Sequence, residues 1–143
     1  MAQTVVTGSC LCGAVTYSVA QPLREVIVCH CTDCQKAGGA GASHNIVVKT
    51  ADIAITAGTP RTYAKTVDSG RVLTRSFCGD CGSQLFSSRS TTPEMSVLKA
   101  GTLDDRSGLV PVMDIWTVET VAYAPCLPGL PQFPGNRPPP KAG

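Results

Sequence analysis

The spacing of the cysteines restricts this chain more than any other feature. Seven of its eight cysteines lie in three short clusters. The clusters are Cys10-Leu-Cys12, Cys29-His-Cys31-Thr-Asp-Cys34 and Cys78-Gly-Asp-Cys81. Thiols this close together serve as disulfides, as a redox-active pair or as metal ligands. The surrounding sequence has to distinguish these three uses.

The disulfide and redox interpretations fit the surrounding sequence poorly. The N-terminus, MAQTVVTGSC, has neither the basic region nor the apolar segment of a secretory signal, so we expect a reducing, cytoplasmic location. Two thiols separated by a single residue also make a crowded disulfide framework. A thioredoxin-like dithiol at Cys31 and Cys34 would need a βαβ context, which the sequence does not show. Metal binding is therefore the favoured use.

Glycines indicate which clusters share a metal ion. Gly13 follows Cys12 and Gly82 follows Cys81, and glycine permits the left-handed turn that aims backbone N–H groups at a thiolate. We therefore assign the two glycine-flanked pairs to one closed, structural zinc site with four thiolates. Its ligands are Cys10, Cys12, Cys78 and Cys81.

The middle cluster then keeps three ligands, Cys29, Cys31 and Cys34. Three protein ligands with an open fourth position are typical of catalytic zinc. A zinc ion held by thiolates favours a soft ligand such as a substrate thiolate, and it can also polarise an oxygen atom. We therefore predict that this second zinc carries the chemistry.

The alternative is a second structural zinc, completed by His30, His44 or Cys126. We expect His30, which is flanked by two ligands on a strand, to point away from the metal as a surface or outer-shell residue. We expect Cys126, in the proline-rich segment, to ligate neither metal, because a fourth thiolate would close the site to substrate. Cys126 would instead be a small apolar filler or part of a pocket wall.

Alternating apolar residues predict an all-β fold with little helix. In residues 14–19 the side chains of Val15, Tyr17 and Val19 fall on one face. Further strands are expected at residues 25–28, 44–49, 52–56, 62–65, 71–77, 84–87, 95–99 and 114–117. The strands at 44–49 and 52–56 are expected to pair across a short turn.

One helical turn is predicted after the middle cluster. Thr32 and Gln35 match a capping box, with Thr32 as the N-cap. Cys34 would then lie in the first turn of a helix, which Gly38 and Gly39 would end.

Composition favours one small metal-binding domain with a small-molecule ligand. The 143 residues are 43% hydrophobic and 15% charged, which suits a packed core. The net charge is +2 and no run of Lys and Arg occurs, so a nucleic-acid surface is not indicated. No apolar stretch is long enough to span a membrane. We expect residues 1–127 to form the zinc-binding domain and residues 128–143 to form a proline-rich strap and tail.

Three stretches of the sequence resemble the glutathione-dependent formaldehyde-activating enzyme family, as a fungal-type, centromere protein V-like member. They are GSCLCGAVTYSV, CHCTDCQKAGG and TRSFCGDCGSQLF, and LKAGTLDD is similar to fungal members. The resemblance spans roughly Gly8 to Trp116. It implies a β-tent fold of two antiparallel sheets with two zinc ions per chain, one on four cysteines and one, not necessarily at full occupancy, on Cys29, Cys31 and Cys34. The implied activity joins formaldehyde to glutathione as S-hydroxymethylglutathione, or reverses that step.

These observations predict a zinc-dependent carbon–sulfur lyase that acts on a thiol–carbonyl adduct such as S-hydroxymethylglutathione, with a small thiol such as glutathione as its partner. His44 or Asp33 would move the proton. Each residue has an equally good alternative role. His44 would be a solvated strand residue, and Asp33 would be a surface charge that stabilises the helix. One alternative is a zinc enzyme of a small-molecule pathway that catalyses isomerisation or cyclisation. Another is a non-enzymatic zinc module with an apolar patch around Trp116 and Phe133.

Overall fold

The computed structural model describes residues 4–67 and 70–137, and it divides the chain into two compact units. The first unit consists of Met1–Arg24 and Ile46–Leu109, and the second of Glu25–Asn45 and Val110–Gly143. The described residues form ten strands in two sheets, one short α-helix and three 3-10 turns, so the prediction of an all-β fold is confirmed. None of the described helices has the length and apolar character needed to cross a membrane.

The three-stranded sheet lies within the first unit. It consists of β1 (Val6–Ser9), β2 (Thr16–Val19) and β5 (Ile53–Ala57), in the order β1-β2-β5 with antiparallel pairing. Tyr17 and Val19 are fully buried, as the alternating pattern predicts. The expected pairing of residues 44–49 with 52–56 is wrong, because β5 pairs with β2. The 3-10 turn η1 (Thr50–Asp52) carries the chain from one sheet to the other.

The other strands of the first unit belong to the seven-stranded sheet. After the second half of β4 (Ser43–Lys49) come β9 (Met95–Lys99), β8 (Gln84–Arg89), β7 (Val72–Phe77) and β6 (Arg61–Thr66). The turn η2 (Ala100–Thr102) follows β9. The hairpin turn from β7 to β8 holds Cys78 and Cys81, and the turn from β1 to β2 holds Cys10 and Cys12. Each cysteine pair of the first unit therefore lies in a hairpin turn.

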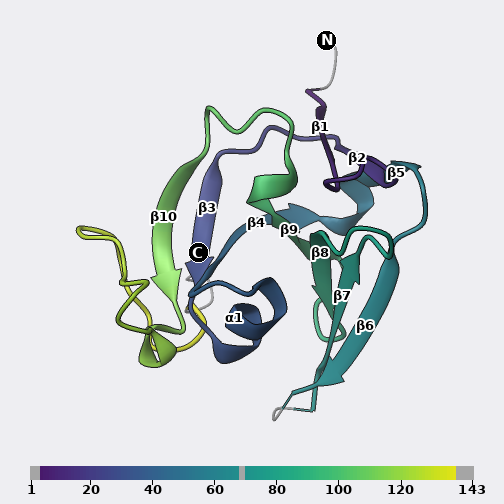
Figure 1. Cartoon of the computed structure of the whole chain (residues 1–143). Coiled ribbons are helices and arrows are strands. Elements are labelled where there is room, and N and C mark those ends of the chain that lie inside the picture. Colours follow the sequence, from purple (N-terminus) through teal and green to yellow (C-terminus); the bar gives the residue numbers. More distant parts are fainter. Residues whose placement is uncertain (1–3, 68–69, 138–143) are drawn as a thin grey trace. The chain divides into compact units, whose positions relative to one another are not determined.

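In the second unit, β3 (Glu25–Cys29) lies between β10 (Val110–Ile115) and the first half of β4. Strand β10 runs parallel to β3, whereas β4 runs antiparallel to it. The carboxyl ends of parallel strands meet at one edge of a sheet. The helix α1 (Thr32–Gly38) and the 3-10 turn η3 (Thr117–Glu119) both start at this edge (Figure 1). The middle cysteine cluster and the end of β10 are thereby brought together.

Part of the proline-rich segment runs along β10. Asp114 forms a parallel bridge with Gln132, and its backbone N–H donates to the carbonyl of Pro131 at 3.0 Å. The N–H of Phe133 in turn donates to the carbonyl of Asp114, also at 3.0 Å. The strap is therefore bonded to the residue that lies opposite Val28 of β3. Residues 138–143 of the expected tail lie outside the described residues.

We expect a Gly58→Ala substitution to destabilise the first unit by about 1–3 kcal/mol. Gly58 has φ +77°, a conformation unfavourable for other residues, and an added Cβ would meet the carbonyl oxygen of Ala14. The matched control is Gly101→Ala, where an added Cβ meets nothing within 4 Å. Urea unfolding of both metal-loaded variants tests this difference, and equal midpoints would contradict it.

Candidate metal centres

Two similar turns hold the cysteines of the first unit. Gly13 and Gly82 both have φ +80°, as expected for a residue that follows the second cysteine of each pair. The N–H of Gly13 donates to the carbonyl of Cys10 at 3.2 Å, and the N–H of Gly82 donates to the carbonyl of Cys78 at 2.9 Å. The prediction from the glycines is therefore confirmed in the backbone of both turns.

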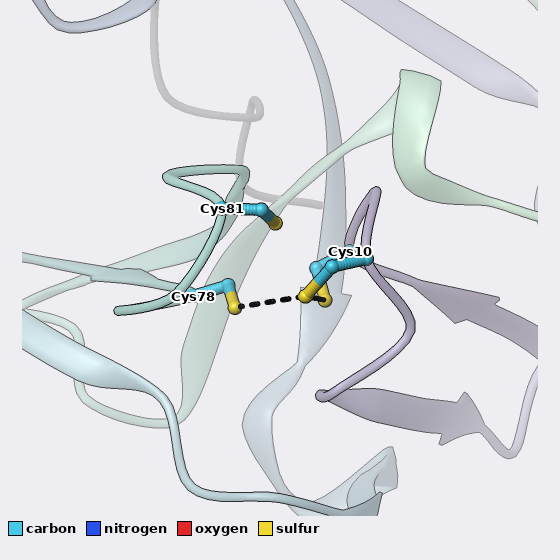
Figure 2. Close-up of side chains that lie close together, drawn as sticks. Cys10, Cys78 and Cys81 are labelled. Atoms are coloured by element: carbon cyan, nitrogen blue, oxygen red, sulfur yellow. Dashed lines mark hydrogen bonds between the residues drawn. The ribbon is translucent and has the colours of Figure 1, made fainter.

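The sulfur atoms of these turns converge on one point (Figure 2). The Sγ atoms of Cys10 and Cys12 are 3.7 Å apart, and those of Cys12 and Cys78 are 3.8 Å apart. With Cys81 they form a group whose Sγ atoms all lie within 4.8 Å of one another. A tetrahedral zinc ion with Zn–S bonds of about 2.3 Å separates its sulfurs by about 3.8 Å. The spacing of the four thiols therefore fits a closed metal site without rearrangement.

The pKa values of these thiols shift in opposite directions. The hydroxyl of Ser83, 3.3 Å from Cys81 Sγ, holds the pKa of Cys81 at about 5. Although a hydrogen bond from the Ala14 N–H lowers the pKa of Cys12, burial and the neighbouring cysteines raise it to about 12. Closely spaced thiolates repel one another, so one ionised sulfur keeps the next protonated. A divalent cation in their midst would remove this conflict.

The middle cluster lies in the second unit, and its three Sγ atoms also lie within 4.8 Å of one another. Cys29 is the last residue of β3, Cys31 precedes α1, and Cys34 lies in its first turn, as predicted. The pKa of Cys29 is raised far above its usual range by the neighbouring thiols of Cys31 and Cys34 and by burial. This group could hold a metal ion, and its three thiols would likewise need a cation in order to ionise together.

The predicted capping box is wrong. The N-cap of α1 is Cys31, whose Sγ accepts a hydrogen bond from the Cys34 N–H at 3.3 Å. The side chain of Gln35 instead donates to the carbonyls of His30, at 2.7 Å, and Glu119, at 3.0 Å. A cysteine can take the capping role here because its sulfur is already placed at the start of the helix by the cluster. Gly39, with φ +70°, ends α1 as predicted.

The two predicted acid–base residues differ in position. His44 is exposed and pairs with Val28, whereas Ser43 pairs with Cys29. Because neighbouring strand residues point to opposite faces, His44 and Cys29 lie on opposite faces of the sheet. Asp33 is half-buried in the first turn of α1, between two cysteines of the cluster. The register therefore does not favour His44 as a group that acts beside the metal.

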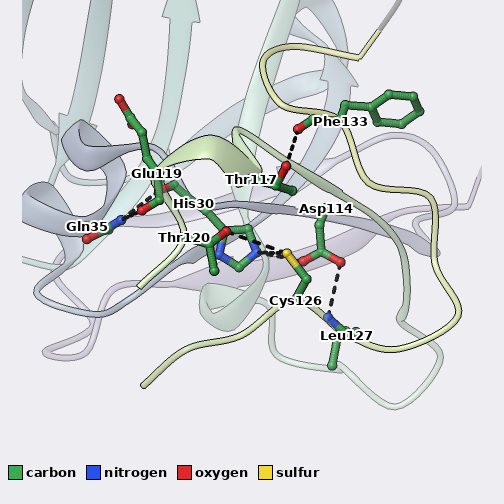
Figure 3. Close-up of polar contacts among 9 residues, drawn as sticks. All are labelled: His30, Gln35, Asp114, Thr117, Glu119, Thr120, Cys126, Leu127 and Phe133. Carbon is green, nitrogen blue, oxygen red and sulfur yellow. Dashed lines mark hydrogen bonds and ion pairs between the residues drawn. The ribbon is translucent and has the colours of Figure 1, made fainter. Parts of the chain in front are cut away.

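Sequence reasoning missed a third group, formed by His30, Asp114 and Cys126 (Figure 3). His30 is only 1% exposed, so the expected surface position is wrong and the outer-shell alternative is left. Its Nε2 atom lies 2.7 Å from Asp114 Oδ1 and 3.8 Å from Cys126 Sγ. The local sequence around His30 could not predict its hydrogen bond with Asp114, because the two residues are 84 positions apart in the chain.

The distances in this third group fit a hydrogen bond better than a metal ion. A tetrahedral zinc would separate its nitrogen and oxygen ligands by about 3.3 Å, well beyond the 2.7 Å between His30 and Asp114. His30 Nδ1 is buried and has no partner among the described residues. A metal on Nε2 would put the ring proton on Nδ1 as an orphaned donor, which is costly. The shared proton therefore lies on Nε2, which donates to Asp114.

Comparison with known proteins agrees with the resemblance seen in the sequence. The sequence pattern of the glutathione-dependent formaldehyde-activating enzyme family matches residues 5–119. No protein with curated function matches the chain significantly. A crystal structure of a Rhodobacter sphaeroides protein is similar, with a TM-score of 0.58 and 23% identity over 73% of this chain and 97% of that one. This likeness supports the fold.

Replacing Cys78 with serine should prevent stable folding of the first unit. The four-cysteine group joins turns that are 66 residues apart, and a closed zinc site can contribute on the order of 10 kcal/mol to folding. Circular dichroism during thermal unfolding, with metal analysis of the purified protein, tests this expectation. A soluble Cys78→Ser protein with an unchanged cooperative transition would contradict it.

Replacing Cys29 with serine should leave a cooperative unfolding transition and remove one metal ion per chain. The middle cluster closes a loop of only a few residues, so its loss restores little entropy to the unfolded chain. The same two measurements apply. Complete unfolding of Cys29→Ser would indicate a second structural metal in place of the predicted open site.

Proposed function

Because this chain belongs to the glutathione-dependent formaldehyde-activating enzyme family, we propose that it is a zinc-dependent carbon–sulfur lyase. Its substrate would be a thiol–carbonyl adduct such as S-hydroxymethylglutathione. Cys29, Cys31 and Cys34 would hold the catalytic metal, and the four-cysteine group would hold a structural one. The family match supports the general activity, and the division of the cysteines supports the assignment of the two sites.

The observation that carries this proposal is the incomplete donor set of the middle cluster. Among the described residues, the group around Cys29 contains three potential ligands, whereas the group around Cys10 contains four. Cys126 belongs to a different group, with His30 and Asp114. A metal held by three cysteines keeps a position for substrate, which is the arrangement of a catalytic site.

Cleavage of the adduct breaks its carbon–sulfur bond. The bonding electron pair goes to sulfur, the hydroxyl proton goes to a water molecule, and the carbonyl double bond of the aldehyde forms. When bound, zinc supplies a soft Lewis acid that stabilises the negative charge on sulfur or oxygen. The reverse reaction would add the thiolate to the aldehyde and return the proton to oxygen.

Ser43 is a polar residue on the same face of the sheet as Cys29. It pairs with Cys29 across β3 and β4, and directly paired residues have Cβ atoms about 4.5–5.5 Å apart. The amide of the buried Asn45 donates to Ser43 Oγ at 3.1 Å. Ser43 can therefore direct its own proton towards a hydroxyl or carbonyl oxygen on the face of Cys29.

Removal of Cys31 should abolish the proposed activity. We expect Cys31→Ser to lower turnover of S-hydroxymethylglutathione by more than the roughly 10- to 100-fold typical for loss of an outer-shell partner of a metal. Formaldehyde release, corrected for the uncatalysed rate, measures the effect. The matched control is Cys126→Ser, a cysteine outside both ligand groups, which should keep its turnover.

Three results would count against the proposed lyase. One is equal turnover by wild-type and Cys31→Ser protein. Another is a wild-type protein that binds two metal ions and does not accelerate the reaction in either direction. The third is a single metal ion per wild-type chain, which is the result expected of a non-enzymatic zinc module.

A further inference from the structure

The loop that contains the middle cluster is bonded to the chain segment that follows β10. The His30 N–H donates to the carbonyl of Ile115 at 3.0 Å, which continues the pairing of β3 with β10. The Thr32 N–H donates to Glu119 Oε2 at 2.6 Å. Residues that are more than 80 positions away in sequence therefore fix the backbone between the cysteines.

Asp114 fixes the side chain of the residue between two of the cysteines. Asp114 Oδ1 accepts the hydrogen bond from His30 Nε2, and both side chains are almost completely buried. Asp114 Oδ2 accepts a second hydrogen bond from the Leu127 N–H at 3.3 Å (Figure 3). Since both oxygens have a donor, the carboxylate has one defined orientation, and it holds the imidazole of His30 in place.

Glu119 fixes the start of the helix that carries Cys34. Thr32 is the first residue of α1, and its N–H is among those that no carbonyl within the helix can satisfy. The carboxylate of Glu119 accepts from this N–H, and a negative charge is favourable there. The carbonyls of Glu119 and His30 also share the amide of Gln35 as donor. Gln35 thereby ties the end of β3 to the segment after β10.

We infer that Asp114 and Glu119 are positioning residues of the three-cysteine metal site. Neither belongs to the ligand group of Cys29, yet together they hold His30 and Thr32, which flank Cys31 on either side. Outer-shell partners of this kind set the geometry of metal ligands. The inference rests on the proposed metal site at Cys29, Cys31 and Cys34.

The four-cysteine site provides a reference within the same protein. Cadmium-113 can replace zinc in both sites, and its NMR signal depends on the number of sulfur ligands, so the two sites give separate signals. Titration with a competing chelator then measures the affinity of each site. These readouts report on the metal environment without requiring turnover.

Asp114→Asn should weaken cadmium binding at the three-cysteine site by about 10- to 100-fold and shift its signal. An asparagine side chain has one acceptor oxygen, so its NH₂ group would face either the His30 or the Leu127 donor. Affinity and signal at the four-cysteine site should stay unchanged. The control Cys126→Ala, which removes the 3.8 Å contact to His30 and a 3.7 Å contact to Thr120 Oγ1, should leave both sites unchanged.

Glu119→Ala is the second variant, chosen because Glu119 is only half-buried and its loss is tolerable for folding. It should weaken the three-cysteine site, whereas Glu119→Gln, which keeps an acceptor for Thr32, should restore most of the affinity. Asp105→Asn, which removes an exposed carboxylate of the first unit, is the charge-matched control.

Unchanged affinity at the three-cysteine site in both Asp114→Asn and Glu119→Ala would overturn the inference. Equal losses at both sites would also overturn it, because they would indicate general destabilisation. Loss of a metal ion from Cys126→Ala would do so as well, since His30, Asp114 and Cys126 would then form a metal site. If wild-type protein binds no metal at the three cysteines, the proposed function itself fails.

Discussion

Repulsion between closely packed thiolates is the constraint on which this structure depends. Seven sulfur atoms lie in two groups, each with all its members within 4.8 Å of one another. Burial and the neighbouring cysteines raise the pKa of Cys12 to about 12, and neighbouring cysteines and burial raise the pKa of Cys29 far above its usual range. Thiols this close together can ionise together only with a cation to balance their charge. The Sγ–Sγ distances of 3.7 and 3.8 Å in the first group match the edge of a zinc tetrahedron.

The two groups differ in how the chain presents them, and this difference suits two roles. The four cysteines of the first unit lie in two hairpin turns, where the glycine that follows each pair gives both turns the same backbone form. The three cysteines of the second unit lie where β3 ends and α1 begins. The side chain of His30 and the backbone N–H of Thr32 in that loop donate hydrogen bonds to Asp114 and Glu119. Four ligands from two such turns suit a closed structural site, and three ligands held by partners outside the ligand group suit one that leaves a position for substrate.

Local patterns made much of the fold predictable from sequence. The alternation of apolar and polar residues predicted most of the strands. Gly13, Gly39 and Gly82 predicted turns, because glycine is the residue that most readily adopts a positive φ. The spacing of the cysteines also gave the two groups that the structure brings together.

Strand pairing and side-chain hydrogen bonds between residues distant in the chain could not be predicted from local sequence patterns. The short strand β1 has only four residues, and β5 pairs with β2 rather than with its neighbour β4. Gln35 looked like a capping residue because Glu119, its partner 84 residues away, is invisible to a local pattern. The same holds for His30, whose side chain contacts Asp114 and Cys126, both more than 80 residues away in the chain. Side-chain networks of this kind are set by tertiary pairing.

Anomalous diffraction at the zinc absorption edge, from crystals of the full chain, would locate the metal ions of both cysteine groups. We expect two peaks per chain. One should lie among the four Sγ atoms of Cys10, Cys12, Cys78 and Cys81. The other should lie among the three Sγ atoms of Cys29, Cys31 and Cys34, with a fourth ligand that the protein does not supply. A single peak, or a second peak closed by a fourth protein side chain, would contradict this expectation.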